Sequence, residues 1–454
     1  MIKLEFDRGS ILVHADGEPD GFHLPGCVFD ERVDLWRAPA RFYREIVTVL
    51  TRSKTPFEDT AREYEELQLA SSLERKPFPY QQEAVDTWAK SGKRGVVVLP
   101  TGAGKTFVAQ MIMGSIQRST LVVTPTIDLM QQWYGVLGTG FDMEVGLIGG
   151  GYYEPRPVTV TTYDSAYIHM ERIGNRFGLI VFDECHHLPG PTYLMAAEAC
   201  IAPFRLGLTA TPDRDDGEEW RLQEAIGPIA YRKEIKELAG DYLSDYETVR
   251  VYVRLSDEER EEYTSERAIY RDFLRMENIS LSGPNGWTRF LMATSRSEQG
   301  RRAFLAYRNQ KSIAQASGAK IRELEDLLAR HRFDRVIIFT SDNKTVYKIS
   351  RKFLIPAITH QTKVKERHEI LQRFNAGDYP FLVTSKVLNE GVDVPAANVA
   401  IVLSGSGSVR EHVQRLGRIL RRAQDKHALL YEVVAEDTAE EYVSSRRRQH
   451  SAYS

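Results

Sequence analysis

Leu99-Pro-Thr-Gly-Ala-Gly-Lys-Thr106 directly follows the apolar run Val96–Val98. The order predicts a buried strand, a glycine-rich turn and a helix, which together form a loop that cradles nucleotide phosphates. Gly102 and Gly104 allow backbone conformations that a side chain forbids, so that successive amide groups can turn toward an anion. The stretch therefore predicts a phosphate-binding loop.

Within this loop, the residues Thr101 to Gly104, including Ala103, are expected to surround the phosphates. Lys105 is expected to reach the β- and γ-phosphates, and Thr106 to place a hydroxyl on the Mg²⁺ ion that bridges them. The full signature has glycine where this chain has Leu99. The motifs that follow must therefore establish what the loop does.

Length and composition limit the classes of protein to which the chain can belong. The chain has 454 residues, which is too long for one core and predicts about three domains. It is 42% hydrophobic and 27% charged, no apolar run approaches a membrane span, and the opening residues MIKLEFDRGS do not resemble a signal peptide. The three cysteines, Cys27, Cys185 and Cys200, form no CxxC pair, which favours a reducing compartment over disulfides or zinc. We expect a cytoplasmic protein with no membrane segment.

Charge is unevenly distributed. The net charge of −3 gives no general attraction to nucleic acid, so such binding must depend on local patches. Residues 1–75 hold 10 Lys and Arg against 15 Asp and Glu, whereas residues 264–320 hold 10 against 4. The basic segment is either a solvated helix face or a nucleic-acid contact.

Short β-branched runs alternate with helical patterns in two series, which predicts α/β folding around parallel sheets covered by helices. The predicted strands are 96–99, 121–124, 158–161, 179–182 and 206–209, followed by 335–340, 357–360, 381–384, 399–403 and 428–433. Between the series lies a charged, mostly helical stretch that contains the capping box Ser256-Asp-Glu-Glu259. The first residues predict a hairpin about Asp7-Arg-Gly-Ser10 and a helix over 41–51. The predicted division is a small α+β module at 1–75, α/β domains at 76–239 and 321–454, and a helical insertion at 240–320.

An acidic motif follows one of these strands. Leu179–Phe182 ends in Asp183-Glu184-Cys185-His186, at the strand edge where α/β sheets bind ligands. Asp183 suits a Mg²⁺ ion, and Glu184 would polarise the water that attacks the γ-phosphate. The alternative is that the two carboxylates only cap the next helix. For His186 and its neighbour, coupling within the cleft is favoured over a metal site, because no Cys/His spacing supports one.

Two weaker motifs flank the loop. Gln81, in Phe78-Pro-Tyr-Gln81, has an amide that can donate to and accept from an adenine edge, although it equally fits a surface helix. Thr209-Ala-Thr211 closes a strand with hydroxyls that either relay changes at the nucleotide or serve ordinary turn chemistry.

Arginines in the second series suggest the other half of a nucleotide site. Gln414-Arg-Leu-Gly-Arg418-Ile-Leu-Arg421 places Arg418 and Arg421 three residues apart on one helix face. An arginine finger of this kind contributes roughly 10³ to 10⁵ in rate. If these arginines act on phosphates held at Lys105, hydrolysis requires two domains to close; the alternative is an exposed basic helix. Gly391 and Asp393, in Asn389-Glu-Gly-Val-Asp393, add a turn and a carboxylate that could hold the ribose.

The ordered motifs LPTGAGKT, DECH, TAT, NEGVDVP and QRLGRILR resemble those of superfamily-two helicases. More closely, the chain resembles the XPB family of DNA repair helicases in its short archaeal or bacterial form. This likeness rests on Asp183–Pro189, Ile355–Thr359, Ser404–Glu411 and Arg41-Phe-Tyr-Arg-Glu45. It implies two RecA-like domains with ATP and Mg²⁺ between them, covering residues 76 to about 435.

The resemblance also implies a 3′–5′ DNA translocase that opens duplex in excision repair or transcription. Residues 1–75 would be a damage-recognition-like module, with contacts to DNA through Arg37, Arg41 and Arg44 or, equally, a protein-docking role. The insertion would be a thumb that touches DNA, for which Arg267, Arg271 and Arg275 share one predicted helix face. A repair nuclease is a possible partner in such a family, and we expect a monomer.

The chain departs from the family at two places. Arg214-Asp215-Asp216 stands where the family has Arg-Glu-Asp, an element that helps to separate strands. Because Asp215 is one methylene shorter, strand separation is expected to be weaker than translocation. Cys185 stands where an apolar residue is common, which is a mild change.

Two other functions are compatible with these motifs. One is an ATP-driven duplex translocase or remodelling module without true unwinding. The other, an RNA helicase, is disfavoured because the acidic motif continues as His187-Leu-Pro rather than with the Asp of the RNA group. Strand displacement compared with triplex displacement distinguishes unwinding from translocation.

Overall fold

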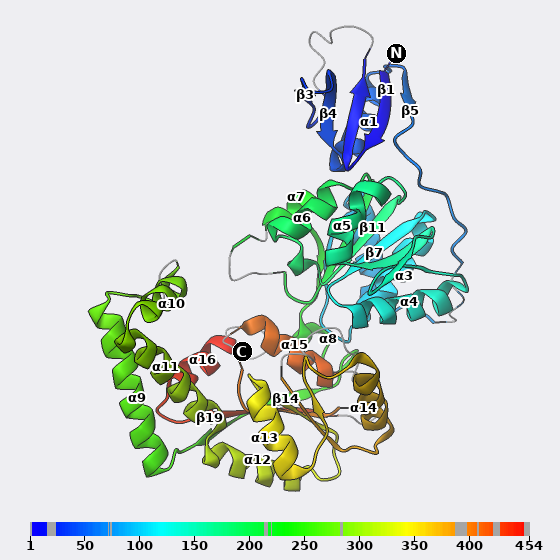
Figure 1. Cartoon of the computed structure of the whole chain (residues 1–454). Helices are drawn as coiled ribbons and strands as arrows, with labels where there is room; N and C mark the ends of the chain where they lie inside the picture. The colour runs from blue at the N-terminus through cyan, green and yellow to red at the C-terminus, as the bar shows by residue number, and fades with distance from the viewer. Residues whose placement is uncertain are drawn as a thin grey trace. The chain divides into compact units, whose positions relative to one another are not determined.

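The structure is a computed structural model. It describes residues 2–15, 24–70, 72, 75–212, 217–218, 220–281, 285–385, 397–405, 408–420 and 427–448. By its internal contacts the chain divides into two compact units, Met1–Glu237 and Leu238–Ser454, which we describe separately. Figure 1 labels their helices and strands.

The first unit begins with a small mixed sheet of strand order β3-β4-β2-β1-β5. Its hairpin turns at Arg8 and Gly9, whose φ angles of 46° and 83° are those of a type I′ turn, so the predicted hairpin is confirmed. One helix, α1, packs its buried face on the sheet. The bounds are β1 (Ile2–Asp7), β2 (Ser10–His14), β3 (Val28–Asp30), β4 (Leu35–Pro39), η1 (Ala40–Phe42), α1 (Tyr43–Arg52) and β5 (Phe57–Asp59).

This module is packed against the α/β sheet that follows it. Ile201, from the α/β part, lies within the module's apolar core. The Arg44 side chain donates to the carbonyls of Gly92 and Pro203 at 2.8 and 3.1 Å, and Glu45 pairs with Arg94. Apolar and polar contacts together therefore join the module to the domain.

The large sheet of the first unit has the order β13-β6-β12-β11-β7-β10-β8-β9 and is parallel except at β9. The five predicted strands are all present, and β8, β9 and β13 add to them. The strands are β6 (Arg94–Val98), β7 (Thr120–Thr124), β8 (Gly146–Gly149), β9 (Tyr152–Glu154), β10 (Val158–Thr162), β11 (Leu179–Asp183), β12 (Phe204–Thr209) and β13 (Ile229–Arg232). The helices are α2 (Pro79–Lys90), α3 (Lys105–Ile116), α4 (Ile127–Phe141), α5 (Tyr163–Ile173), η2 (Cys185–His187), α6 (Pro191–Glu198), α7 (Trp220–Ala225) and α8 (Ile235–Leu238).

The second unit has an all-parallel sheet of order β14-β19-β18-β15-β17-β16. Its strands are β14 (Tyr246–Val253), β15 (Val336–Phe339), β16 (Ala357–Ile358), β17 (Phe381–Thr384), β18 (Val399–Val402) and β19 (Ala428–Ala435). The helices associated with it are α12 (Gly318–Arg330), α13 (Asn343–Phe353), α14 (Val364–Ala376), α15 (Val409–Ile419) and α16 (Ala439–Arg447). The two α/β sheets explain the alternating pattern of the sequence.

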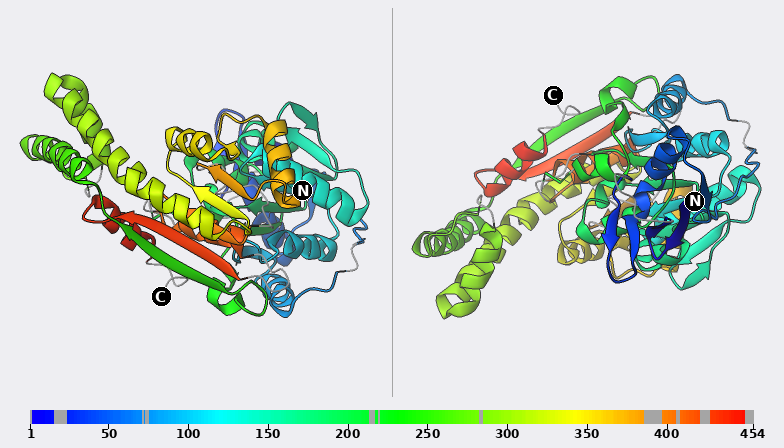
Figure 2. Two further views of the ribbon diagram at one scale, coloured as in Figure 1. Left: turned by 90° about the horizontal axis from the view of Figure 1, so that it is seen from below. Right: turned by 90° about the horizontal axis from the view of Figure 1, so that it is seen from above.

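Strand β14 lies inside residues 240–320, which the sequence analysis assigned to a helical insertion. It pairs in parallel with β19 along all eight residues, and the two strands lie side by side in both views of Figure 2. Half-buried residues predominate in β14, so it lacks the strong apolar run by which the other strands were predicted.

Three helices follow β14: α9 (Asp257–Met276), α10 (Gly286–Arg296) and α11 (Glu298–Ala316). They share an aromatic core of Tyr270, Phe273 and Phe290 with Ala303 and Ala306. The predicted capping box opens α9, because Ser256 and Glu259 exchange side-chain to backbone hydrogen bonds. Among the described helices, none has the length and apolar composition of a membrane span.

Candidate active site

The predicted phosphate loop lies between β6 and α3. Gly102 and Gly104 have φ angles of 89° and 80°, which favour glycine. A Cβ atom on Gly104 would stand 2.5 Å from Nε2 of Gln81, so a side chain there would also have to displace the Gln81 amide. Leu99 by contrast is fully buried and contributes its backbone carbonyl, which accepts from Nζ of Lys105 at 3.3 Å. The atypical residue therefore leaves the loop intact.

The acidic motif meets the loop at the same edge of the sheet. Nζ of Lys105 lies 3.8 Å from Oε1 of Glu184, and both side chains are mostly buried, at 11% and 13% exposure. The two residues follow β6 and β11, which β12 separates in the sheet. Strand order thus brings together groups that are 79 positions apart in sequence.

Asp183 lies at the end of β11 and is buried. Its Oδ2 accepts from the indole Nε1 of Trp133 at 2.7 Å, and its Oδ1 from the amide of Glu184 at 3.1 Å. Burial, together with the neighbouring charge of Glu184, raises the pKa of Asp183 to about 6. Sequence reasoning missed Trp133, since a tryptophan in an amphipathic helix gives no signal beyond burial.

Glu184 has a left-handed backbone, with φ of 46°. Among the described atoms, its Oε2 is buried without a hydrogen bond, 3.5 Å from Nδ1 of His186. That nitrogen is also 3.0 Å from Oγ1 of Thr209. His186 therefore contacts both the acidic motif and the Thr209-Ala-Thr211 turn, and the coupling role favoured above remains a prediction.

Gln81 also lies at the loop, but its amide is engaged within the protein. Oε1 accepts from the amide of Phe78 at 3.0 Å, and Nε2 donates to the carbonyl of Ala103 at 3.0 Å. Tyr80 donates to the same carbonyl at 2.7 Å. Gln81 is fully buried, so it is not a surface residue of α2. Its amide has two donors and two acceptor lone pairs, but in this conformation it is not exposed to a ligand.

The residues present fit a nucleotide with magnesium. A glycine cradle at a helix N-terminus, a lysine, and a hydroxyl and carboxylate at one strand edge match the groups that bind phosphate and Mg²⁺. Thr106 lies in the first turn of α3 and is partly exposed. The buried Glu184 Oε2, which has no hydrogen bond among the described atoms, is an acceptor for a water molecule at this edge.

Several predicted site residues are not described. Arg214, Asp215, Asp216, Gly391, Asp393 and Arg421 lie outside the described residues. Gln414 and Arg418 lie on α15, where the structure gives the backbone but not these two side chains. Between them, Arg415 is buried, with its guanidinium 5.1 Å from the ring centre of Phe339.

The sequence predicts that Arg267, Arg271 and Arg275 share one face of α9. In the structure their environments differ. Arg267 is partly buried and donates to Tyr263 and to Gln310 at 3.0 and 3.4 Å, so it joins α9 to α11. Arg271 and Arg275 are exposed, although Arg275 pairs with Asp272 at 3.3 Å. Because residues spaced four apart do not point in the same direction on an α-helix, Arg267 faces α11 more than Arg275 does.

The arginines suggested for the N-terminal module are likewise engaged. Arg37 pairs with Asp7 and Asp30, and Arg44 holds the module on the α/β sheet. Arg41 lies over the Phe42 ring at 4.3 Å. These contacts favour structural roles over a free basic surface.

Three family models match the chain. They describe the "Xeroderma pigmentosum group B helicase damage recognition domain" at residues 4–61, the "Type III restriction enzyme, res subunit" at 74–214 and the "Helicase conserved C-terminal domain" at 319–423. Among solved structures, the helicase domain of Hef from Pyrococcus furiosus aligns with a TM-score of 0.54 and 21% identity, over 82% of this chain and 98% of that one. This likeness supports the fold, two RecA-like domains.

Curated relatives agree with these models. The "DNA 3′-5′ translocase XPB2" of Sulfurisphaera tokodaii is 40% identical over 99% of this chain and 100% of its own length. The "DNA 3′-5′ helicase XPB" of Mycobacterium tuberculosis is 34% identical over 81% of this chain and 62% of its own. The XPB/SSL2 helicase/translocase subunit of general transcription and DNA repair factor IIH from Saccharomyces cerevisiae is 28% identical over 82% and 43%. The chain belongs to the XPB family of superfamily-two DNA helicases.

Proposed function

We propose that the protein is an ATP-dependent 3′–5′ DNA translocase and helicase, which couples ATP hydrolysis to opening of duplex DNA in nucleotide excision repair or transcription. The observation that carries the proposal is the approach of Lys105 to Glu184 at 3.8 Å, beside the buried Asp183. The full-length similarity to an archaeal DNA translocase supports the same activity.

Each group at this edge has a proposed role in hydrolysis. Lys105 and the backbone of Thr101–Gly104 hold the phosphates, and Glu184 accepts a hydrogen bond from the attacking water and orients it. Thr106 and Asp183 hold Mg²⁺, which neutralises phosphate charge when bound. Gln81 contacts the base.

The second half of the proposed site comes from the other unit. Gln414, Arg418 and Arg421 stabilise the charge of the transferring phosphoryl group, and Gly391 with Asp393 holds the ribose. The support is the sequence pattern QRLGRILR in the span that matches the conserved C-terminal helicase domain. Because a guanidinium remains charged at any working pH, these groups suit transition-state stabilisation.

For DNA, we propose contacts by Arg271 and Arg275, which are exposed on α9. Arg214, Asp215 and Asp216 would act at strand separation. Arg267, proposed with them from the sequence, would act through its hydrogen bonds to Tyr263 and Gln310.

We further propose the division into a module at 1–75, RecA-like domains at 76–239 and 321–454 and a thumb at 240–320. The family matches at 4–61, 74–214 and 319–423 support these boundaries. A monomeric, cytoplasmic protein that works beside a repair nuclease or other repair or transcription proteins completes the proposal.

A second function, translocation without unwinding, is favoured by two observations. Asp215 is a shorter acid than the Glu of the family's strand-separating element, and one full-length relative bears the name translocase. An RNA helicase is less well supported, because the named relatives act on DNA.

The proposal is tested by ATP turnover measured without nucleic acid and with duplex DNA, forked DNA, lesion-containing DNA and RNA. We expect DNA to stimulate ATP turnover by about 10-fold or more and RNA to have little effect. The reason is that binding of the correct nucleic acid is expected to complete the nucleotide site. Equal stimulation by RNA would contradict the assignment to DNA.

A further inference from the structure

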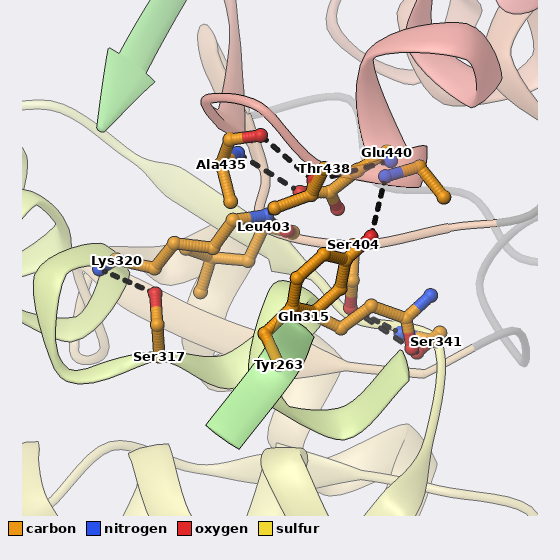
Figure 3. A network of polar contacts seen from close by, with 11 residues as sticks. Tyr263, Gln315, Ser317, Lys320, Ser341, Leu403, Ser404, Ala435, Thr438 and Glu440 are labelled. Carbon is orange, nitrogen blue, oxygen red and sulfur yellow. Dashed lines mark hydrogen bonds and ion pairs between the residues drawn. The ribbon is translucent and has the colours of Figure 1, made fainter. Parts of the chain in front are cut away.

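The chain is held in place where β18 ends, at Leu403 and Ser404. Lys320, on α12, donates from Nζ to the carbonyl of Leu403 at 2.6 Å. Ser404 accepts at Oγ from the amide of Ser341 at 2.9 Å. Leu403 and Ser404 are both about 1% exposed. One contact from α12 and one from the loop between β15 and α13 therefore fix this turn, which Figure 3 shows from close by.

The Lys320 ammonium is itself fixed. It has no exposure, and its Nζ lies 2.6 Å from Oε2 of Glu440, whose side chain is 4% exposed. The same oxygen accepts from the amide of Ala435 at 3.0 Å. Burying such a pair costs solvation that an apolar pair would not, so stability alone is a weak reason for it.

The network also reaches the helices that precede α12. Gln315, near the end of α11, accepts at Oε1 from Ser341 Oγ at 2.7 Å. Tyr263, on α9, accepts from the amide of Ala439 at 2.8 Å. A cavity of about 320 Å³, lined in part by Tyr263, Gln315 and Glu440, lies at this junction. Polar contacts therefore join α9, α11, α12 and α16 at this junction, beside an apolar cluster that includes Tyr263, Ala314 and Leu403.

The turn leads into α15, which begins at Val409. Helix α15 packs against β18, β19 and α16, so Leu403 at the end of β18 and Glu440 on α16 both lie beside the surface that supports it. We propose that Lys320 is a positioning residue for ATP hydrolysis: by holding the Leu403 carbonyl and pairing with Glu440, it fixes the surface against which α15, the helix that carries Gln414 and Arg418, packs. This inference rests on the proposed function, because it assigns those residues to the phosphoryl-transfer site.

The test uses the full-length chain with Lys320→Met combined with Glu440→Gln. The double variant removes both charges and keeps the approximate side-chain shape, whereas a single change leaves one charge buried alone. Leu324→Ala is the matched control, because Leu324 is fully buried one turn along α12 and packs in the apolar core of the sheet. Both are measured for kcat with saturating duplex DNA, for the dissociation constant of a fluorescent ATP analogue and for thermal stability.

We expect the double variant to lose about 10-fold or more in kcat while nucleotide affinity changes less than about 2-fold, since a misplaced arginine affects the transition state more than binding. The control should keep its kcat at a comparable loss of stability. Equal kcat in double variant and control would overturn the proposal.

A second variant keeps the test decisive if the double variant does not fold. Ser404→Ala removes only the hydrogen bonds to Ser341, and we expect it to lower kcat several-fold with unchanged nucleotide affinity; wild-type kcat would overturn the proposal. Wild-type protein without ATP turnover would instead contradict the proposed function, so the two failures are distinguishable.

Discussion

Lys105 and Glu184 are the residues on which hydrolysis should depend most directly. Lys105→Ala removes the cation proposed to bind the phosphates, and Glu184→Gln removes the carboxylate proposed to orient the attacking water while keeping the side-chain shape. We expect each to lower DNA-stimulated ATP turnover by about 100-fold or more, and Glu184→Gln to leave ATP binding largely intact. Turnover close to that of wild type in either variant would remove the corresponding assignment.

Trp133 is expected to act through Asp183. Its indole donates to Oδ2 at 2.7 Å, and removing such a supporting hydrogen bond typically weakens metal binding by roughly 10- to 100-fold. Trp133→Phe should therefore raise the Mg²⁺ concentration for half-maximal turnover by about 10-fold. Trp88→Phe is the control, because Trp88 donates its indole to the carbonyl of Arg205, at the start of β12. An identical magnesium titration for both variants would count against the role of Trp133.

Arg421 is assigned from the sequence alone. If it supplies charge to the transition state, Arg421→Ala should lower kcat by about 10-fold or more and leave the ATP dissociation constant within about 3-fold of wild type. The two constants are measured by turnover and by nucleotide titration. A matched loss of affinity would favour a structural role.

For single residues, prediction from the sequence was correct where the order of strands in the sheet decides which residues lie together. The strand-loop-helix pattern and the acidic strand end predicted that Lys105 and Glu184 lie together, because parallel strands end at one edge of a sheet. It did not predict that Arg267 contacts Tyr263 and Gln310, because helical spacing alone does not say which face a neighbouring helix covers. It missed Trp133, because the sequence does not show that α4 places this side chain against Asp183 at the end of β11.

Among the elements, α6 and α7 depend on one buried arginine. Arg205 donates to the carbonyls of Ala202, Ala197, Ala225 and Cys200 at 3.2, 3.0, 2.7 and 2.6 Å. Ala197 and Ala225 lie in the last turns of the two helices, where carbonyls lack helical partners. Burial lowers the pKa of Arg205 to about 10, which still keeps it charged at neutral pH.

Arg205→Met should therefore lower the free energy of unfolding by about 3 kcal/mol or more, because it leaves buried carbonyls without donors. Arg52→Met, at an exposed position on α1, should change it by less than about 0.5 kcal/mol. Denaturant titration of both variants gives the comparison. Similar denaturation midpoints for Arg205→Met and Arg52→Met would contradict this prediction and would indicate that water replaces the guanidinium as donor to the carbonyls.

Helix α9 gives a prediction about DNA. Arg271→Ala with Arg275→Ala should reduce the salt dependence of duplex binding, by about one unit of slope for each phosphate that the protein no longer neutralises. Arg267→Ala should instead lower stability, because Arg267 joins α9 to α11. Fluorescence anisotropy at several salt concentrations measures the slope, and an unchanged slope in the double variant would exclude direct phosphate binding by these residues.

The helices and strands were predicted to different degrees. Runs such as Val336–Phe339 are fully buried and stand out in the sequence. Strands β8, β9, β13 and β14 were missed, since β9 and β14 are largely exposed or half-buried, and β8 contains two glycines. Strands β9, β13 and β14 lie at sheet edges, where a strand lacks the continuous apolar run on which strand prediction depends.

At the scale of the molecule, the sequence motifs predicted that one nucleotide site is shared by two RecA-like domains. Lys105 and Glu184 lie in the first unit, whereas α15 lies in the second. The sequence did not predict that the N-terminal module packs against the first α/β sheet. This packing depends on single contacts, such as the hydrogen bond from Arg44 to the Gly92 carbonyl and the burial of Ile201 in the module's core. Composition alone reports only that the module is acidic.

The central claim is that ATP hydrolysis at Lys105 and Glu184 drives movement along DNA. The most direct measurement is displacement of a third strand from a blunt duplex, with ATP and Mg²⁺, by wild type and by Glu184→Gln. The account predicts ATP-dependent displacement by wild type, faster than strand separation of a 3′-tailed duplex, and none by Glu184→Gln. Displacement that proceeds without ATP, or equally well with Glu184→Gln, would contradict it.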